Sequence, residues 1–140
     1  MAKIILDDAS VVVNSVDLSA SVQSVTINYE AEQQDCTTMG QDTRANKGGL
    51  KNWSIDVTFV QDWDAASVDA TIFPIVGGEF PIVVKPTSAA VSATNPSYSA
   101  TATIASYSPI GNSVGDLAVA PVSFMPSGTG SNPNLVRATS

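Results

Sequence analysis

The sequence predicts a mainly β fold: a β-sandwich or small barrel with one short flanking helix, a long inter-strand loop and an extended C-terminal tail. Several segments alternate polar and apolar residues with a period of two, which is the spacing of half-buried strands. One short segment with helical spacing separates two groups of such strands, an order typical of a sandwich or barrel. With 140 residues, 44% of them hydrophobic, the chain is expected to bury one core.

The two clearest strands are predicted at 22–30 and 53–59. Their apolar faces, which we expect to form the core, consist of Val25, Ile27, Tyr29, Trp53, Ile55, Val57 and Phe59. Their polar faces consist of Ser24, Thr26, Asn28, Glu30, Ser54, Asp56 and Thr58. Further strands are expected at 10–13, 80–85, 100–107 and 117–124.

A helix is predicted over 65–73, between the two groups of strands. Asp62 or Asp64 is expected to accept hydrogen bonds from its first free N–H groups. Pro74 does not fit a helix interior, so the helix should end near it. The buried stripe is expected to consist of Val68, Ile72 and Ile75 or Val76.

Two segments lack any periodicity. Residues 31–49 are polar and exceed the usual hairpin connection of about two to five residues, so we expect a long loop that is either mobile or an interaction arm. Residues 126–140 are rich in Gly, Ser, Asn and Pro, which favours a flexible extension or an arm that orders on a partner. The prediction is therefore a single domain over 1–125 followed by a C-terminal arm.

The charge of the chain is acidic and unevenly placed. Thirteen acidic and six basic residues give a net charge of −7, and all acids except Asp116 lie within residues 1–79. Without a basic patch, conventional nucleic-acid binding and docking to anionic membranes are disfavoured. Residues 80–140 carry only Lys85, Asp116 and Arg137. Because charges are depleted at interface cores, we expect neighbouring subunits to cover part of this half.

The N-terminus does not resemble a secretory signal peptide. It has one basic residue and a short apolar patch that Asp7 and Asp8 interrupt. No apolar run approaches the roughly 18 to 20 residues that span a bilayer. We therefore expect the protein to be made and used in the cytoplasm, unless it leaves the cell inside an assembly.

The composition gives no signature of an enzyme or of a cofactor. There is no histidine, and Cys36 is the only cysteine, which disfavours Ser-His-Asp and Cys-His catalysis, zinc sites and an internal disulfide. The close carboxylates at 7–8 and 62/64 lack the further oxygen ligands of a calcium site. No catalytic residue, metal ligand or cofactor is therefore assigned. The expected role is that of a structural protein that assembles with copies of itself.

The order of these elements resembles the small tail tube (major tail) proteins of long-tailed bacteriophages, over nearly the whole chain. The residues that carry the resemblance are, in order, Val25-Thr26-Ile27-Asn28-Tyr29, Thr38-Met39-Gly40, Arg44, Gly49-Leu50-Lys51-Asn52-Trp53-Ser54-Ile55-Asp56-Val57, Gln61-Asp62, Val68-Asp69-Ala70-Thr71-Ile72-Phe73, Asn95-Pro96-Ser97-Tyr98 and Ser113-Val114-Gly115-Asp116-Leu117. No short motif among them is diagnostic alone, and the specificity comes from their order.

The resemblance implies a virion protein of the phage tail, assembled in the host cytoplasm into stacked hexameric rings. The subunit sheets would join in a continuous barrel, and DNA would pass through its lumen during ejection without specific binding. Other tail proteins would be further partners, and no membrane is implied. The long loop would bridge rings through Gln34, Asp35, Cys36, Thr37, Thr38, Met39, Gln41, Asp42 and Arg44. The lumen-facing residues would be Ser24, Thr26, Asn28, Glu30, Ser54, Asp56 and Thr58.

Elementary electrostatics agrees with a conduit, because cationic contacts to phosphate would add affinity and slow the movement of DNA. The same polar faces are also what any antiparallel sheet presents to water.

Two alternative functions stay open. A capsid head decoration protein fits the same composition. A carbohydrate- or cell-surface-binding β-sandwich module would stack sugars on Trp53, Trp63, Tyr98 and Tyr107. The expectation that both tryptophans are buried, as core or interface anchors, argues against the second alternative.

Overall fold

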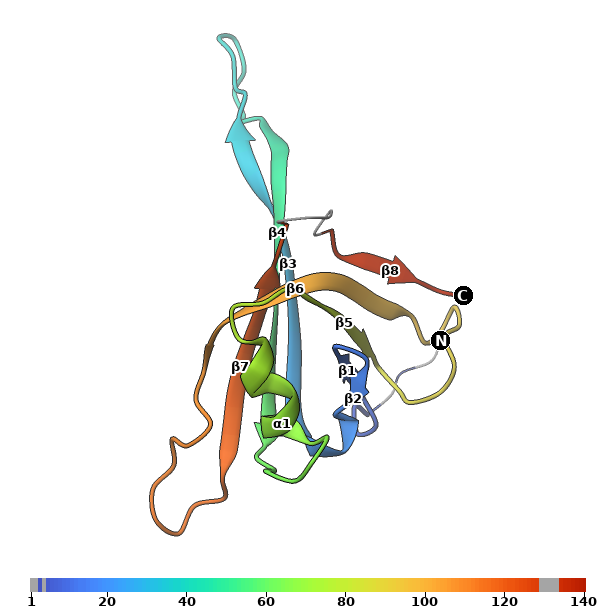
Figure 1. Ribbon diagram of the computed structural model, residues 1–140. Helices are drawn as coiled ribbons and strands as arrows, with labels where there is room; N and C mark the ends of the chain where they lie inside the picture. Colours follow the sequence, from blue (N-terminus) through green and yellow to red (C-terminus); the bar gives the residue numbers. More distant parts are fainter. Residues whose placement is uncertain (1–2, 4, 129–133) are drawn as a thin grey trace.

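The structure is a computed structural model that describes residues 3, 5–128 and 134–140 (Figure 1). The strands are β1 (Ser10–Val13), β2 (Val16–Asp17), β3 (Val22–Asp35), β4 (Asn46–Val60), β5 (Phe80–Lys85), β6 (Ser97–Tyr107), β7 (Val119–Pro126) and β8 (Val136–Ala138). The helical elements are the short helix α1 (Val68–Ile72) and the 3₁₀ turns η1 (Ser19–Ser21) and η2 (Phe73–Ile75). The predicted mainly β fold with one short helix is confirmed.

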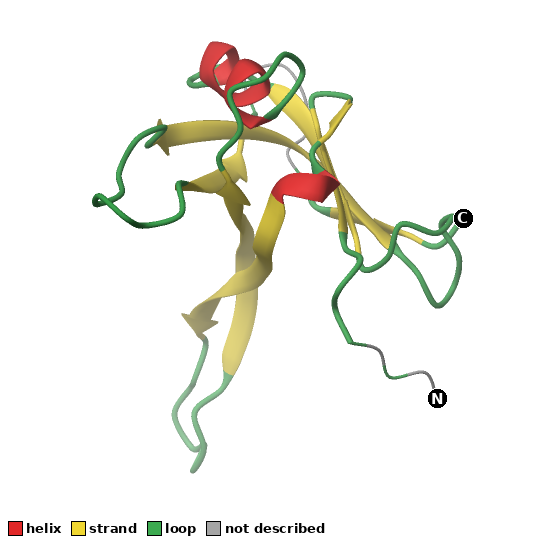
Figure 2. Cartoon of the chain, turned by 90° about the horizontal axis from the view of Figure 1, so that it is seen from below, coloured by secondary structure: helices red, strands yellow, loops and turns green. Residues whose placement is uncertain are grey.

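All strands belong to one antiparallel sheet. Its order is β2-β1-β5-β6-β7-β4-β3, and β8 pairs separately with β6. The sheet curls so that its two halves lie across from each other (Figures 1 and 2), but it stays open, because β3 and β2 end the order at opposite edges. Among the described residues, no strand pairs with the outer edge of β3.

The core lies between the halves of the curled sheet and is centred on β4. Ile55 pairs with Ile27 of β3 on one side and with Phe124 of β7 on the other. Phe124 is fully buried and meets Phe80 edge to face, with 5.8 Å between ring centroids. The buried apolar residues of β4 are Trp53, Ile55, Val57 and Phe59, so the predicted apolar face of this strand is confirmed.

The predicted apolar face of β3 is only partly buried. Val25 and Ile27 are half-buried and pack against the edge of the core, whereas the Tyr29 side chain is 54% exposed. The prediction that Tyr29 is a core residue is therefore wrong. The physical reason is that β3 is the last strand of an open sheet, and no strand of the described residues lies beyond it.

The helix is shorter than predicted. It begins at Val68 rather than at residue 65, because Ala66 has a positive φ of 59° that a right-handed helix does not accept. Ser67 stands at the N-cap, and no side chain caps the helix there. Asp62 accepts a hydrogen bond from the N–H of Asp64 (3.0 Å), within the turn that precedes it. The Asp62 carbonyl, however, accepts a hydrogen bond from the N–H of Asp69 in the first turn (3.1 Å). Asp62 therefore accepts from a free N–H group of the helix as predicted, but through its main chain and not as a side-chain cap. The predicted burial of Val68 and Ile72 is confirmed.

The predicted loop over 31–49 is largely strand. β3 and β4 stay paired as far as Asp35 and Asn46, with one irregularity between Ala31 and Gln33, so the connection covers only 36–45. The hairpin projects from the body of the molecule (Figure 1). Neither of its faces is buried, and a strand without a buried face has no alternation for the sequence to show. We call residues 31–49 the arm.

The C-terminal residues return to the sheet. Part of the predicted C-terminal arm, 126–140, falls on residues 129–133, which lie outside the described residues. Beyond them, Leu135 packs against the edge of the core, and β8 pairs with the first residues of β6. This end of the chain therefore contributes a strand to its own sheet.

Replacing Phe124 with alanine is expected to lower the free energy of unfolding by about 3–5 kcal/mol, because it leaves a cavity beside Phe80. Phe73→Ala is the matched control, since the Phe73 side chain is 66% exposed, and its effect should stay within about 0.5 kcal/mol. Denaturant unfolding of the unassembled chain, followed by tryptophan fluorescence, measures both values. Equal effects of the two substitutions would contradict the assigned core.

Candidate assembly surfaces

The tip of the arm is a built turn rather than a loose connection. The N–H of Cys36 donates to the carbonyl of Ala45 (2.8 Å), and the N–H of Ala45 donates to the Thr37 hydroxyl (2.7 Å). The Gln41 side chain accepts a hydrogen bond from the N–H of Thr38 (2.9 Å). These bonds satisfy backbone groups that would otherwise compete for other partners, so the tip keeps one shape while it is exposed.

Asp35 ties the two sides of the tip together. Its carboxylate accepts hydrogen bonds from the N–H of Thr37 (3.0 Å) and from the guanidinium of Arg44 (2.9 Å). Hydrogen bonding by Thr37, through side chain and backbone, and then by Arg44 lowers the pKa of Asp35 below its ordinary value of 3.8. The side chains of Arg44 and Asp35 are 81% and 50% exposed, so this pair orients the turn more than it stabilises the fold.

The residues predicted to bridge rings all lie on the arm, and all are exposed. Gln34 and Asp35 end β3, and the others lie within the 36–45 connection. The apolar side chain of Met39 is completely exposed at the turn. None of these residues belongs to the core, so the arm is free to contact another molecule. Their part in ring stacking stays a prediction.

The residues predicted to face a lumen share one face of the sheet. The register pairs Ser24 with Thr58, Thr26 with Asp56, and Asn28 with Ser54. The Asn28 amide lies within hydrogen-bond distance of the Ser54 hydroxyl (3.3 Å) and of the Asp56 carboxylate (3.4 Å).

The same face of the sheet continues onto a third strand, β7, that the sequence reasoning did not include, where Ser123 is its one polar residue beside Val119, Pro121 and Met125. Ser123 of β7 lies opposite Asp56, and Pro121 lies opposite Thr58. The alternation along β7, with Val122 buried between Pro121 and Ser123 and Phe124 buried after Ser123, is the signal that identifies these two residues. The three-strand face presents hydroxyl, amide and carboxylate groups, and neither the predicted residues nor these two include a cation.

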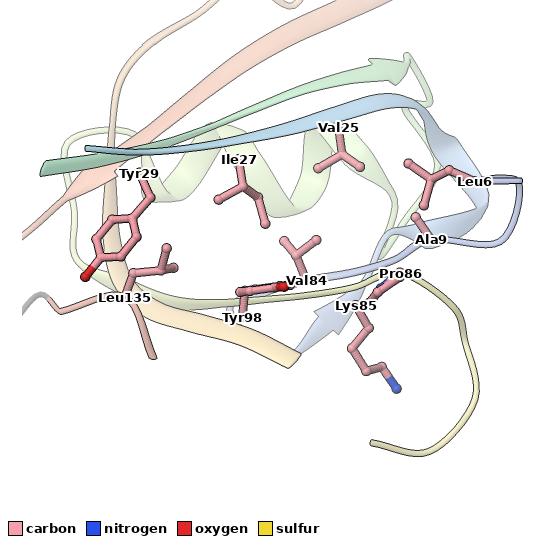
Figure 3. Close-up of a pocket in the computed structure, with 10 residues that line it drawn as sticks. All are labelled: Leu6, Ala9, Val25, Ile27, Tyr29, Val84, Lys85, Pro86, Tyr98 and Leu135. Atoms are coloured by element: carbon pink, nitrogen blue, oxygen red, sulfur yellow. The ribbon is translucent and has the colours of Figure 1, made fainter. Parts of the chain in front are cut away.

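An apolar groove of about 410 Å³ opens beside β3 (Figure 3). Val25, Ile27 and Tyr29 extend from β3 toward Val84 of β5 and Tyr98 of β6. Leu6 and Leu135 close its two ends. The sequence reasoning missed this groove because it placed the apolar face of β3 in a closed core.

The four aromatic residues of the carbohydrate-binding alternative do not form a shared platform. Trp53 is 4% exposed and belongs to the core, whereas Tyr98 lines the groove. Trp63 is 55% exposed, so the expectation that it is buried is wrong, because it follows the end of β4 in a surface turn. The Tyr107 hydroxyl accepts a hydrogen bond from the Gln61 side-chain amide (2.8 Å) and donates one to the Asp69 carboxylate (3.1 Å), so it is engaged within the subunit.

The described part of the chain contains neither a cluster of metal-ligating side chains nor a helix that could span a membrane. Its His, Cys, Asp and Glu side chains form no group of three or more that could hold a metal ion. No helix within it has the length and apolar character needed to cross a membrane.

Comparison with known proteins finds its matches among solved structures. No protein-family model matches the chain, and no curated protein does either. A chain in the "virion of native gene transfer agent (GTA) particle" is 17% identical with a TM-score of 0.72, covering 94% of this chain and 95% of that one. The SPP1 tail tube subunit is 12% identical with a TM-score of 0.73, covering 99% and 80% respectively.

A chain in the tail of an empty gene transfer agent particle, refined with C6 helical symmetry, also matches. It is 18% identical with a TM-score of 0.62, and the match covers 83% of this chain and 81% of that one. The resemblance to tail tube proteins is thus confirmed at the level of the fold, over nearly the whole chain.

Asp35→Asn is expected to loosen the tip of the arm near neutral pH, because an amide holds Thr37 and Arg44 less firmly than a carboxylate. The pKa of Asp35 is lowered in the folded chain, so its stabilisation is complete above the ordinary value and is lost as the pH falls through the lowered one. In acid the wild-type tip should therefore approach the disorder of the variant.

Backbone ¹⁵N relaxation of residues 36–45 in the unassembled chain measures this effect. Asp42→Asn, which changes another exposed carboxyl of the same turn, should leave the tip ordered. Equal relaxation in wild type and Asp35→Asn at every pH would contradict the assigned role.

Proposed function

We propose that this chain is a structural, non-catalytic subunit of a tail tube in a phage-type virion. The observation that carries the proposal is the match in fold to the SPP1 tail tube, with a TM-score of 0.73 over 99% of this chain. The matches to chains in gene transfer agent particles support the same place, the tail of a virion. Because these structures are only 12–18% identical to this chain, the proposal is also supported by the free sheet edge, the polar face and the arm.

The free edge of β3 supports self-assembly through the sheet. This 14-residue strand pairs with β4 on one side, and no strand of the described residues pairs with its outer edge. Such an edge exposes a row of backbone N–H and C=O groups, which natural proteins normally protect. In a ring, a strand of the neighbouring copy would cover this edge and continue the sheet. Because each copy presents the same two edges, the contact repeats until the ring closes. The C6 symmetry of the gene transfer agent tail supports six copies per ring.

The polar face of β3, β4 and β7 is the proposed lining of the lumen. In a barrel formed from these sheets, the apolar core lies on the opposite side, so the polar face remains for the channel. A wall of hydroxyls, amides and the carboxylates of Glu30 and Asp56 gives duplex DNA no cation to bind, and DNA therefore slides past it.

The arm is the proposed contact between successive rings. It is a rigid hairpin outside the core, with an ordered tip and an exposed methionine. Such an element costs little conformational entropy when it binds, because its shape is already set. Other tail proteins would meet the same surfaces at the two ends of the tube. Negative-stain microscopy of the purified protein distinguishes a tail tube subunit from a head decoration protein.

Replacing residues 32–50 with Asn-Gly is expected to leave a folded chain that forms no tubes. The two-residue turn closes the hairpin at the Ala31–Lys51 pair, and the removed residues contribute nothing to the core. Negative-stain microscopy of concentrated protein compares wild type, expected to form rods, with the shortened chain. Circular dichroism shows whether the shortened chain is folded.

Normal rods from the shortened chain would contradict the role of the arm. Wild-type protein that stays monomeric or trimeric and binds only to capsids would instead favour a head decoration protein.

The double substitution Glu30→Lys/Asp56→Lys is expected to preserve tubes and to slow DNA release from particles whose tails contain it. Two cations per subunit, repeated around and along the lumen, would bind phosphate, and each contact strengthens binding in a salt-dependent way. The measurement is the rate at which DNA becomes accessible to nuclease, at low and high salt. Asp7→Lys/Asp64→Lys, the same charge change at exposed sites elsewhere, should leave the rate unchanged. Equal rates for both double variants would contradict the lumen assignment.

A further inference from the structure

Among the described residues, none fills the apolar groove beside β3 and buries its walls. Ile27 and Val25 remain half-buried and Tyr29 is 54% exposed. The groove of about 410 Å³ lies within the usual range for sites that bury a ligand, roughly 300–1,000 Å³. Lys85 is the one charged residue among those that line it. In Figure 3 its ammonium points away from the groove, so the groove itself suits an apolar segment, and a negative charge on that segment would lie outside it, at the rim.

The loop 108–118, between β6 and β7, presents such a segment. The side chains of Ile110, Val114 and Leu117 are 81%, 106% and 63% exposed. Three large apolar residues exposed within one short loop are unusual for a surface in contact with water alone. Asp116 is the only charged residue of this loop.

This exposure does not result from a loose loop, because both ends of the loop are anchored. Gln61 donates from its side chain to the carbonyl of Pro109 (2.9 Å) and from its backbone N–H to the carbonyl of Ala118 (2.9 Å). The Asn112 side chain accepts a hydrogen bond from the N–H of Val119 (3.1 Å). The loop is thus held in place while its apolar side chains face outward.

The groove and the loop lie on different sides of the subunit. The loop leaves the sheet between β6 and β7, on the left of Figure 1, whereas the groove lies between β3 and the residues Val84 of β5 and Tyr98 of β6 (Figure 3). One copy therefore cannot fill its own groove with its own loop. A contact between two such different surfaces is heterologous, so it repeats from copy to copy and closes a ring or continues as a helix.

We propose that loop 108–118 of one copy docks into the apolar groove of the neighbouring copy in the same ring. Ile110, Val114 and Leu117 fill the space between β3 and β6, and Asp116 lies near Lys85 of the neighbour. Lys85 donates to the carbonyl of Ala89 (3.0 Å) and interacts electrostatically with the Asp17 carboxylate, but no carboxylate among the described residues lies within ion-pair distance of it. The contact deepens the proposed function and rests on it, since it identifies what holds neighbours together beside the shared sheet.

Cysteine cross-linking tests this contact directly. In a Cys36→Ser background, Tyr98→Cys and Val114→Cys place one thiol in the groove and one on the loop. After assembly and treatment with a short bismaleimide reagent, denaturing gels should show a ladder of covalent multimers. The matched control combines Tyr98→Cys with Met39→Cys, which carries an equally exposed position on the arm, and should give no ladder.

The outcomes separate this inference from the proposed function. If the wild-type chain forms no tubes or rings, the proposed function fails. If it assembles, but the Val114 pair gives no ladder or only the Met39 pair does, the loop-to-groove contact is wrong and the arm becomes the candidate occupant. Unfolding midpoints of the unassembled variants, expected to match that of the Cys36→Ser parent, show that the substitutions leave the fold intact.

A charge exchange gives a second, independent readout. Lys85→Asp and Asp116→Lys should each raise the protein concentration needed for assembly roughly two- to fivefold, because each creates a like-charged pair at the contact. The double variant restores opposite charges and should return close to the wild-type value. If the double variant assembles no better than the single variants, the two residues do not meet.

Discussion

The structure depends on the two-sided pairing of β4. From Trp53 to Val60 this strand alternates strictly, and its buried apolar residues lie between β3 and β7, with Ile55 opposite both Ile27 and Phe124. A slip of one residue on either side would turn every buried side chain toward water, so burial of one face sets the register of all three strands. The same register places the hydroxyl, amide and carboxylate side chains together on the opposite face. The core and the proposed lumen lining are therefore two results of one constraint.

The open edge of the sheet accounts for the remaining surfaces. β3 ends the strand order, and no described strand pairs with its outer backbone edge. Its apolar face borders a groove, and its far end leaves the body as the arm. In a protein that acts alone, these would be liabilities for solubility and aggregation. In the proposed ring each receives a partner: the edge joins a neighbouring sheet, the groove takes a neighbouring loop, and the arm reaches the next ring.

Solved structures with 12–18% sequence identity to this chain share its fold. Such a fold is maintained by the pattern of apolar and polar residues rather than by particular side chains, because core positions accept different apolar residues of suitable volume. Surface chemistry is under no such constraint. The groove, the loop 108–118 and the Lys85 and Asp116 charges are therefore features to test on this chain itself.

The sequence alone determined the mainly β class, the β4 core face, the buried residues Val68 and Ile72 of the helix and the shared polar face, because each depends on a period imposed by one buried side. It also indicated the resemblance to tail tube proteins, through the order of its elements. The sequence did not reveal that 31–49 is a paired hairpin, since a strand exposed on both faces has no period. The exposure of Tyr29 and the groove were decided only by the tertiary structure, because they follow from the position of β3 at the edge of an open sheet, and edge position is a property of how the strands are ordered in space.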